Sequence, residues 1–109
     1  MKYGNIKTTI DNIKFDSKAE ANRYLELKLL LKGKVIKDLR MQPRFVLLES
    51  FIDGQGEKHR KIEYVADFEY KEGSKHIIED VKGMKTEVYK LKKKLFLYTY
   101  RSSIFREIN

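Results

Sequence analysis

One hairpin signal constrains the fold of this chain more than any other feature of its sequence. Residues 61–70 and 75–82 are two runs with the β-branched and aromatic residues typical of strands, and a short polar segment, KEGS, lies between them. If Gly73-Ser74 forms a two-residue turn, Glu72 pairs with Lys75. The register of the whole hairpin then follows by counting outward from that pair.

This register determines which side chains share a face of the hairpin. Counting outward places Asp67 across from Asp80 and Val65 across from Lys82. Because side chains alternate along a strand, Asp67, Asp80 and Lys82 lie on one face. Glu79 points away from them, and the opposite face is the predicted core face: Ala66, Phe68, Tyr70, Ile77 and Val81.

The shared face indicates a metal site. Two carboxylates directly opposite each other, about 5 Å apart at the backbone, repel unless positive charge lies between them. Carboxylates that hold Mg²⁺, with an ammonium group near the developing negative charge, supply what phosphodiester hydrolysis requires. A surface hairpin decorated with charges is the alternative, since Asp-x-Lys triplets are common. The basic segment that follows at once favours the catalytic interpretation.

Two amphipathic helices are expected outside the hairpin. The first covers residues 17–32 and ends at Gly33, and the second is capped by Thr86. The predicted packing stripe of the first helix is Ala21, Tyr24, Leu25, Lys28 and Leu29, widened by Leu27, Leu30 and Leu31. The predicted packing face of the second helix is Val88, Leu91, Leu95 and Tyr98.

Further strands complete a mixed α/β sandwich. A small hairpin is expected within residues 6–15 around Asp11-Asn12, and strands at residues 35–39, 45–52 and 103–108. The main order is α-β-β-β-α-β, with a mixed sheet flanked by helices. The 109 residues fit a single domain, 1–109, with no run near the ~20 apolar residues that cross a membrane.

The net charge of +8 is concentrated in one segment. Residues 82–101 hold seven basic residues and one acid. Such a segment attracts a polyanion, with nucleic acid as the commonest candidate and an anionic membrane surface as the next; a solvated helix face is the plain alternative. The candidate DNA-binding residues are Lys85, Lys90, Lys92, Lys93 and Lys94.

The composition excludes several other kinds of chemistry. There is no cysteine, which excludes disulfides and thiolate sites and fits a reducing cytoplasm. Neither a P-loop nor a dinucleotide fingerprint occurs, so no nucleotide cofactor is expected. His59 and His76 lie in or beside predicted turns and lack metal-ligand spacing, so we expect no role for them in a metal site.

The stretch YVADFEY…EDVKGMKTEVYKLKKK, residues 64–94, resembles the core of PD-(D/E)xK nucleases, the restriction-endonuclease-like superfamily. It resembles more closely a phage-encoded, uncharacterised family within that superfamily. The likeness extends to KYGN at residues 2–5, FDSKAEANRY at 15–24 and QPRF at 42–45. It therefore covers nearly the whole chain and implies a restriction-endonuclease-like fold.

The resemblance also implies roles for individual residues. Asp67 and Asp80 would be metal ligands and Lys82 the catalytic lysine, although the proline of the family motif is Ala66 here. Glu20 matches the helix acid that often completes such a site. Ser17-Lys18-Ala19-Glu20 is equally a capping box, in which Glu20 returns to the N-cap amide, so both interpretations of Glu20 stay open.

These inferences lead to an expected function. The protein is expected to be a Mg²⁺-dependent DNA endonuclease of phage type, with Mn²⁺ as a possible substitute, that works in the cytoplasm of the bacterial host. By analogy with other small nucleases of this fold, we expect a homodimer that resolves Holliday junctions or other branched DNA. The alternative is a DNA-binding accessory protein of phage replication or recombination that keeps the fold without cleaving.

Overall fold

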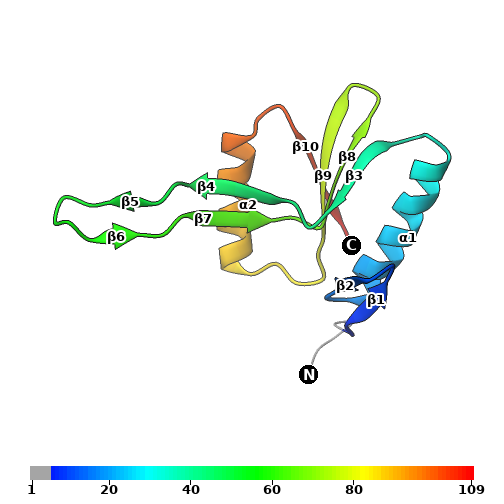
Figure 1. The fold of residues 1–109 in the computed structure, drawn as a ribbon, viewed down its shortest axis with the longest axis horizontal. Coiled ribbons are helices and arrows are strands. Elements are labelled where there is room, and N and C mark those ends of the chain that lie inside the picture. The colour runs from blue at the N-terminus through cyan, green and yellow to red at the C-terminus, as the bar shows by residue number, and fades with distance from the viewer. Residues whose placement is uncertain (1–5) are drawn as a thin grey trace.

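A computed structural model describes residues 6–109 of the chain (Figure 1), so the KYGN motif lies outside the described residues. The elements in chain order are β1 (Thr8–Ile10), β2 (Ile13–Phe15), α1 (Lys18–Lys32), β3 (Lys37–Met41), β4 (Arg44–Leu48), β5 (Phe51–Ile52), β6 (Lys58–His59), β7 (Ile62–Val65), β8 (Phe68–Glu72), β9 (Lys75–Val81), α2 (Glu87–Thr99) and β10 (Ile104–Ile108). The predicted small hairpin is present, and its turn residues Asp11 and Asn12 both have positive φ.

A mixed four-stranded sheet forms the centre of the molecule, in the order β10-β9-β8-β3. Strand β8 is antiparallel to both β9 and β3, whereas β10 is parallel to β9. The sheet lies between the two helices (Figure 1). Neighbouring residues of β9 point to opposite sides, so Ile77 packs in a cluster with α1 and Ile78 in a cluster with α2. The predicted mixed α/β architecture is therefore confirmed.

The predicted register of the hairpin is confirmed from its turn to Phe68. Glu72 pairs with Lys75, and Phe68 pairs with Glu79 at the far end of β8. Gly73 has φ +62, a left-handed conformation that favours glycine in a two-residue turn. Beyond Phe68 the backbone N–H of Asp67 still donates to the carbonyl of Glu79, at 3.1 Å.

Beyond Asp67 the predicted hairpin is wrong. Val65 belongs to β7 and pairs with Arg44, while the N–H of Lys82 donates to the carbonyl of Ile108. Ala66 packs with Tyr64, Ile78 and α2, not on the predicted core face. The cause is a crossing point near Pro43, where the chain leaves the central sheet after β3 to enter β4 and returns to it from β7 into β8. Backbone bonds from Gln42 N to Asp67 O and from Ala66 N to Pro43 O hold this crossing point.

Residues 44–65 form a two-stranded arm that projects from the body (Figure 1). Strand β4 pairs with β7 near the body, and β5 pairs with β6 near the tip. The Cα radius of gyration is 15.9 Å, larger than the ~13 Å of a compact domain of this length. The single strand predicted at residues 45–52 is two strands, β4 and β5, and both lie in the arm and not in the central sheet.

Helix α1 begins and ends where the sequence predicts, and α2 begins at its predicted cap. Ser17 and Thr86 accept hydrogen bonds from the amides three residues later, and Gly33 ends α1. The first packing stripe is only half correct, because Ala21, Tyr24 and Leu27 are buried but Leu25 and Leu29 are 46% and 71% exposed.

The predicted packing face of α2 is wrong. Its residues Val88, Leu91, Leu95 and Tyr98 are exposed, and the helix packs through Tyr89 and Phe96 instead. The helix has two apolar stripes, and the aromatic one contacts Phe45, Tyr64 and Phe105. Large rings bury more apolar area than aliphatic side chains, which explains why this stripe packs inward.

Candidate metal centre

The acidic residues singled out from the sequence come together at the crossing point. Asp80 lies on β9, Asp67 directly precedes β8, and Glu20 lies in the first turn of α1. Burial and, to a smaller extent, the negative charges of Asp80 and Glu20 together raise the pKa of Asp67 to about 9. Burial, and to a smaller extent the negative charges of Asp16 and Asp80, raise the pKa of Glu20 as well. These carboxyl groups are therefore near enough to influence one another's ionisation.

Asp80 is the most buried member of this group, with 1% of its surface exposed. Its Oδ2 accepts a hydrogen bond from the hydroxyl of Tyr64. Its Oδ1 is buried and has no hydrogen-bond partner among the described residues, although the ammonium of Lys82 lies 3.3 Å away in an ion pair without hydrogen-bond geometry. A buried carboxylate oxygen is costly to leave without a partner. Asp80 thus presents one free ligand atom beside two further carboxyl groups.

A hydrogen bond from the backbone of β9 fixes the carboxyl group of Asp67. Its Oδ2 accepts a hydrogen bond from the amide of Val81, at 2.6 Å. Glu79, as alternation predicts, points away from the centre and pairs with Arg23. Strand alternation therefore predicted correctly that Glu79 and Asp80 lie on opposite faces of β9.

Lys82 is held against the second helix. Its Nζ lies 4.6 Å from the ring centroid of Tyr89, within the range of a cation–π interaction. The Tyr89 hydroxyl donates to Glu107 Oε2 at 2.6 Å, and the pKa of Glu107 is lowered to about 2 by this bond and by Lys93 and Lys85. Packing of α2 against β10 therefore fixes the position of the ammonium group.

Sequence reasoning missed the contributions of Tyr64, Tyr89 and Glu107. Tyr89 lies outside the packing face predicted for the second helix, yet it is buried and contacts Lys82. Tyr64 lies beyond the point where the chain leaves the hairpin, so strand alternation could not place its hydroxyl beside Asp80. No local sequence signal identifies these three residues.

Comparison with protein families gives one match, which covers residues 1–108 and is described as a protein of unknown function, DUF1064. The chain belongs to this family. No curated protein and no solved structure matches it. No helix within residues 6–109 is long and apolar enough to cross a membrane.

For this DUF1064 protein, the geometry bears on the two interpretations of Glu20. The backbone half of the capping box is present, because Ser17 Oγ accepts from the amide of Glu20 at 3.1 Å. No hydrogen bond from the Glu20 side chain back to Ser17 is found within residues 6–109, and its carboxyl interacts with Asp67 instead. Glu20 therefore takes part in the helix cap through its backbone amide and in the acidic group through its side-chain carboxyl.

The predicted DNA-binding lysines of the DUF1064 chain are not equivalent. Lys85 and Lys93 both pair with Glu107, at 3.1 Å each, and Lys90 pairs with Glu87 at 3.3 Å. Their charges are partly offset within the protein. Among the described residues, Lys92 and Lys94 form no such ion pair, so they contribute the largest uncompensated charge on α2.

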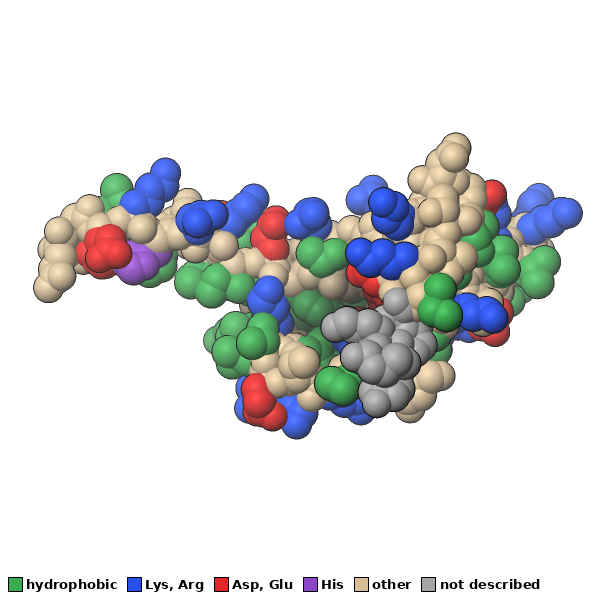
Figure 2. All heavy atoms as spheres, turned by 90° about the horizontal axis from the view of Figure 1, so that it is seen from below, with side chains coloured by type: hydrophobic (Ala, Val, Ile, Leu, Met, Phe, Trp, Pro, Cys, Tyr) green, Lys and Arg blue, Asp and Glu red, His purple; other side chains and the backbone are tan. Residues whose placement is uncertain are grey.

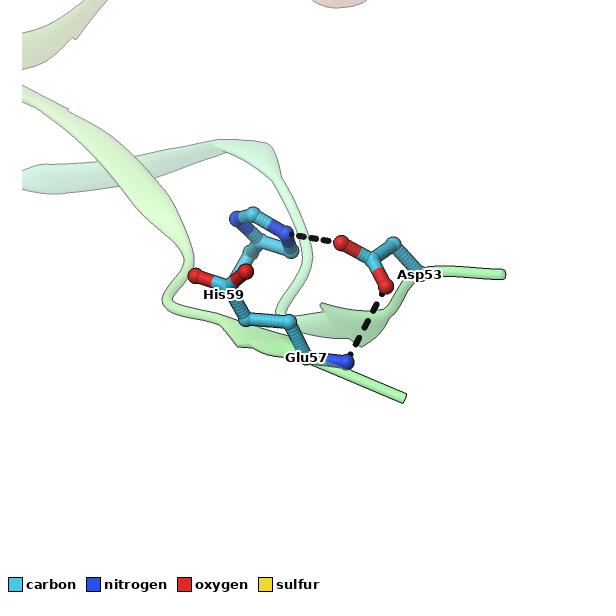
Figure 3. Close-up of side chains that lie close together, drawn as sticks. All are labelled: Asp53, Glu57 and His59. Atoms are coloured by element: carbon cyan, nitrogen blue, oxygen red, sulfur yellow. Dashed lines mark hydrogen bonds and ion pairs between the residues drawn. The ribbon is translucent and has the colours of Figure 1, made fainter. Parts of the chain in front are cut away.

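A second group of possible metal ligands lies at the tip of the arm (Figure 3). One ligand atom each of Asp53, Glu57 and His59 lies within 4.8 Å of the others, although the sequence spacing of His59 predicted no such grouping. The loop itself already uses Asp53, which accepts from the amides of Gln55 and Glu57 and contacts His59 Nε2 at 2.8 Å. These bonds explain the group as an element that orders the turn.

The raised pKa of Asp67 predicts a pH dependence of stability in chelator. Asp67 ionises near 3.8 in the unfolded chain and near 9 in the folded protein, so the folded state binds more protons between these values. Stability therefore falls as pH rises through this window, by at most about 1.4 kcal/mol per pH unit. Urea unfolding in EDTA at pH 6, 7 and 8 measures this slope. The slope should become shallower in Asp67→Asn, and an equal slope in both proteins would contradict the assignment.

Proposed function

We propose that this DUF1064 protein is a metal-dependent DNA endonuclease with a PD-(D/E)xK-type centre formed by Asp67, Asp80 and Lys82. The observation that carries the proposal is the buried Oδ1 of Asp80, which has no hydrogen-bond partner among the described residues and lies beside two further carboxyl groups and an ammonium. Within the central sheet and its helices, the elements follow in the chain order α1, β3, β8, β9, α2, β10, which supports a restriction-endonuclease-like core.

The residues present fit a hard divalent cation. Asp80, Asp67 and Glu20 offer carboxylate oxygens, the ligands that Mg²⁺ and Mn²⁺ prefer. The acids repel one another, and they raise the pKa of Asp67 in the absence of positive charge. A bound divalent cation polarises the phosphate and activates water for attack. We propose Mg²⁺, with Mn²⁺ as an alternative.

The side chains have separate tasks in this scheme. Asp80 is oriented by the Tyr64 hydroxyl, so only its other oxygen is free to act as a ligand. Asp67 must release its proton to become a ligand, which makes metal affinity rise with pH. The ammonium of Lys82, fixed over the Tyr89 ring, lies where it can offset negative charge that grows on the phosphate in the transition state.

A basic surface near the centre favours DNA as the substrate. Figure 2 shows Lys and Arg side chains along one side of the arm and continuing over the body. The arm carries Arg44, Lys58, Arg60 and Lys61, all of them exposed. A two-stranded ribbon fits the major groove of duplex DNA. We therefore extend the proposed DNA path from the lysines of residues 82–101 to the arm.

The most informative test combines binding and cleavage in one experiment. The protein is incubated with linear, nicked, single-stranded and four-way-junction DNA, with Mg²⁺, Mn²⁺ or EDTA. Metal-dependent cleavage supports the nuclease, and preference for the junction supports a phage-type Holliday-junction resolvase. Salt-sensitive binding without cleavage in either metal would instead support the DNA-binding accessory protein.

Glu20 and its cap can be separated by a pair of variants. Glu20→Gln keeps the amide that Ser17 caps but removes an anionic ligand, so cleavage should be lost with little change in stability. Ser17→Ala removes the cap and should cost about 1 kcal/mol of stability while cleavage persists. Cleavage rates and thermal melting are measured on both proteins. Full cleavage by Glu20→Gln would show that Glu20 is not a ligand.

A further inference from the structure

Helix α2 presents an apolar stripe on the side that faces away from the sheet. The stripe consists of Val88, Leu91, Leu95 and Tyr98, which are 63%, 58%, 37% and 68% exposed. The core-facing residues Tyr89 and Phe96 lie on a different side of the helix, about 130° around its axis from the centre of the stripe. Figure 2 shows hydrophobic side chains gathered at the lower left, where α2 lies below the arm.

The spacing of the stripe is that of a coiled-coil seam. The intervals of three, four and three residues place Val88 and Leu95 at a positions and Leu91 and Tyr98 at d positions of a heptad. A strict a/d stripe is narrower than the face with which a helix packs on a globular core. In parallel coiled coils a β-branched residue at a followed by leucine at d favours two strands, and Val88 and Leu91 form such a pair in the first heptad.

The charges beside the seam are complementary in the same arrangement. Glu87 occupies a g position and Lys92 the following e position, five residues later. In a parallel pair, g of one helix lies beside the next e of the other, so Glu87 and Lys92 would form two symmetric ion pairs. Glu87 is 91% exposed and contacts only Lys90 of its own helix among the described residues. An antiparallel pair would instead bring Lys92 near Lys92 of the other helix.

We propose that the protein dimerises through α2, with the stripe of one copy against the same stripe of a second copy and the two helices parallel. The interface is isologous and closes on itself, as expected for a two-fold dimer. Lys92 then forms an ion pair across the interface. Lys94 on α2 and the basic side of the arm stay available to bind DNA.

The parallel arrangement has a consequence that rests on the proposed function. Lys82 precedes the start of α2 by five residues, so both metal centres would lie toward the same end of the paired helices. Two centres related by a two-fold axis suit the cutting of two strands of one duplex or junction. A dimer without nuclease activity would refute only the proposed function, because the interface is measured by mass and not by cleavage.

The test measures the mass of the full chain by sedimentation equilibrium over a range of concentrations. Wild type should be dimeric, and Leu91→Glu should raise the dissociation constant by about tenfold or more, because it places a charge in the seam. Leu29→Glu is the matched control, since Leu29 is an exposed leucine on α1, with 71% of its surface accessible against 58% for Leu91. Circular dichroism should show both variants folded. A monomeric wild type at all concentrations would overturn the proposal.

Charge reversal tests the parallel register separately. Glu87→Lys and Lys92→Glu should each weaken the dimer, and the double variant should restore it. Failure of the double variant to restore the dimer would refute the parallel arrangement. A monomer that pelleted with phosphatidylserine vesicles through this stripe would assign α2 to an anionic membrane surface instead, and would overturn the proposal.

Discussion

Asp80→Asn is expected to reduce DNA cleavage by about 1000-fold or more, because loss of the metal removes several kcal/mol of transition-state stabilisation and each ~1.4 kcal/mol is tenfold in rate. Asparagine can still accept the hydrogen bond from Tyr64, so the fold should be preserved. Removal of the Asp80 charge also weakens the repulsion that opposes ionisation of Asp67. Thermal stability in EDTA should therefore hold or rise, while the stabilisation by Mg²⁺ disappears.

The control for Asp80→Asn is Asp53→Asn, which alters the other group of possible ligands at the arm tip. This variant should cleave like wild type and keep its Mg²⁺-induced shift in melting temperature. DNA binding should survive in both variants, since it depends mainly on lysines and arginines outside the centre. If Asp80→Asn cleaved at the wild-type rate, the proposed metal centre would be wrong whatever the fold.

The second large effect is expected on stability, from the ion pair that joins α1 to β9. Arg23 donates to both oxygens of Glu79, at 2.8 and 2.6 Å, and the Glu79 side chain is completely buried. Tyr70 also donates to Glu79. Arg23→Ala leaves this carboxylate buried without its cation, which should cost about 3–5 kcal/mol. The melting temperature should fall by about 10–20 °C.

Two comparisons make the Arg23 prediction specific. Lys28 lies on the same helix as Arg23 and forms an exposed ion pair with Asp11. Lys28→Ala removes this pair and should cost less than about 1 kcal/mol. The double variant Arg23→Met/Glu79→Met removes both charges and should recover much of the loss, because no unpaired charge stays buried. Urea unfolding at neutral pH measures all three proteins. Equal stability of Arg23→Ala and Lys28→Ala would show that the buried pair does not anchor α1.

Local rules were sufficient for the part of the centre that lies on one hairpin. A Gly-Ser turn fixes the pairing of the residues beside it, and the two-residue period of a strand then assigns the side chains to faces as far as Asp67. For this reason the sequence by itself groups Asp67, Asp80 and Lys82 and separates Glu79 from them. The helix bounds follow in the same way from Ser17, Gly33 and Thr86.

The tertiary structure alone decided what surrounds that hairpin. The sequence of residues 45–52 is typical of an ordinary strand. Only the tertiary contact at the crossing point, between Pro43 and Ala66, directs this segment into the arm. Helix α2 has two apolar stripes, and the competition between them depends on Phe45, Tyr64 and Phe105, which are distant in sequence. The residues that position the centre, Tyr64 on Asp80 and Tyr89 under Lys82, follow from these long-range choices. Turn geometry and strand period act between near neighbours and can be read from sequence, whereas packing partners are set by which surfaces bury most apolar area together.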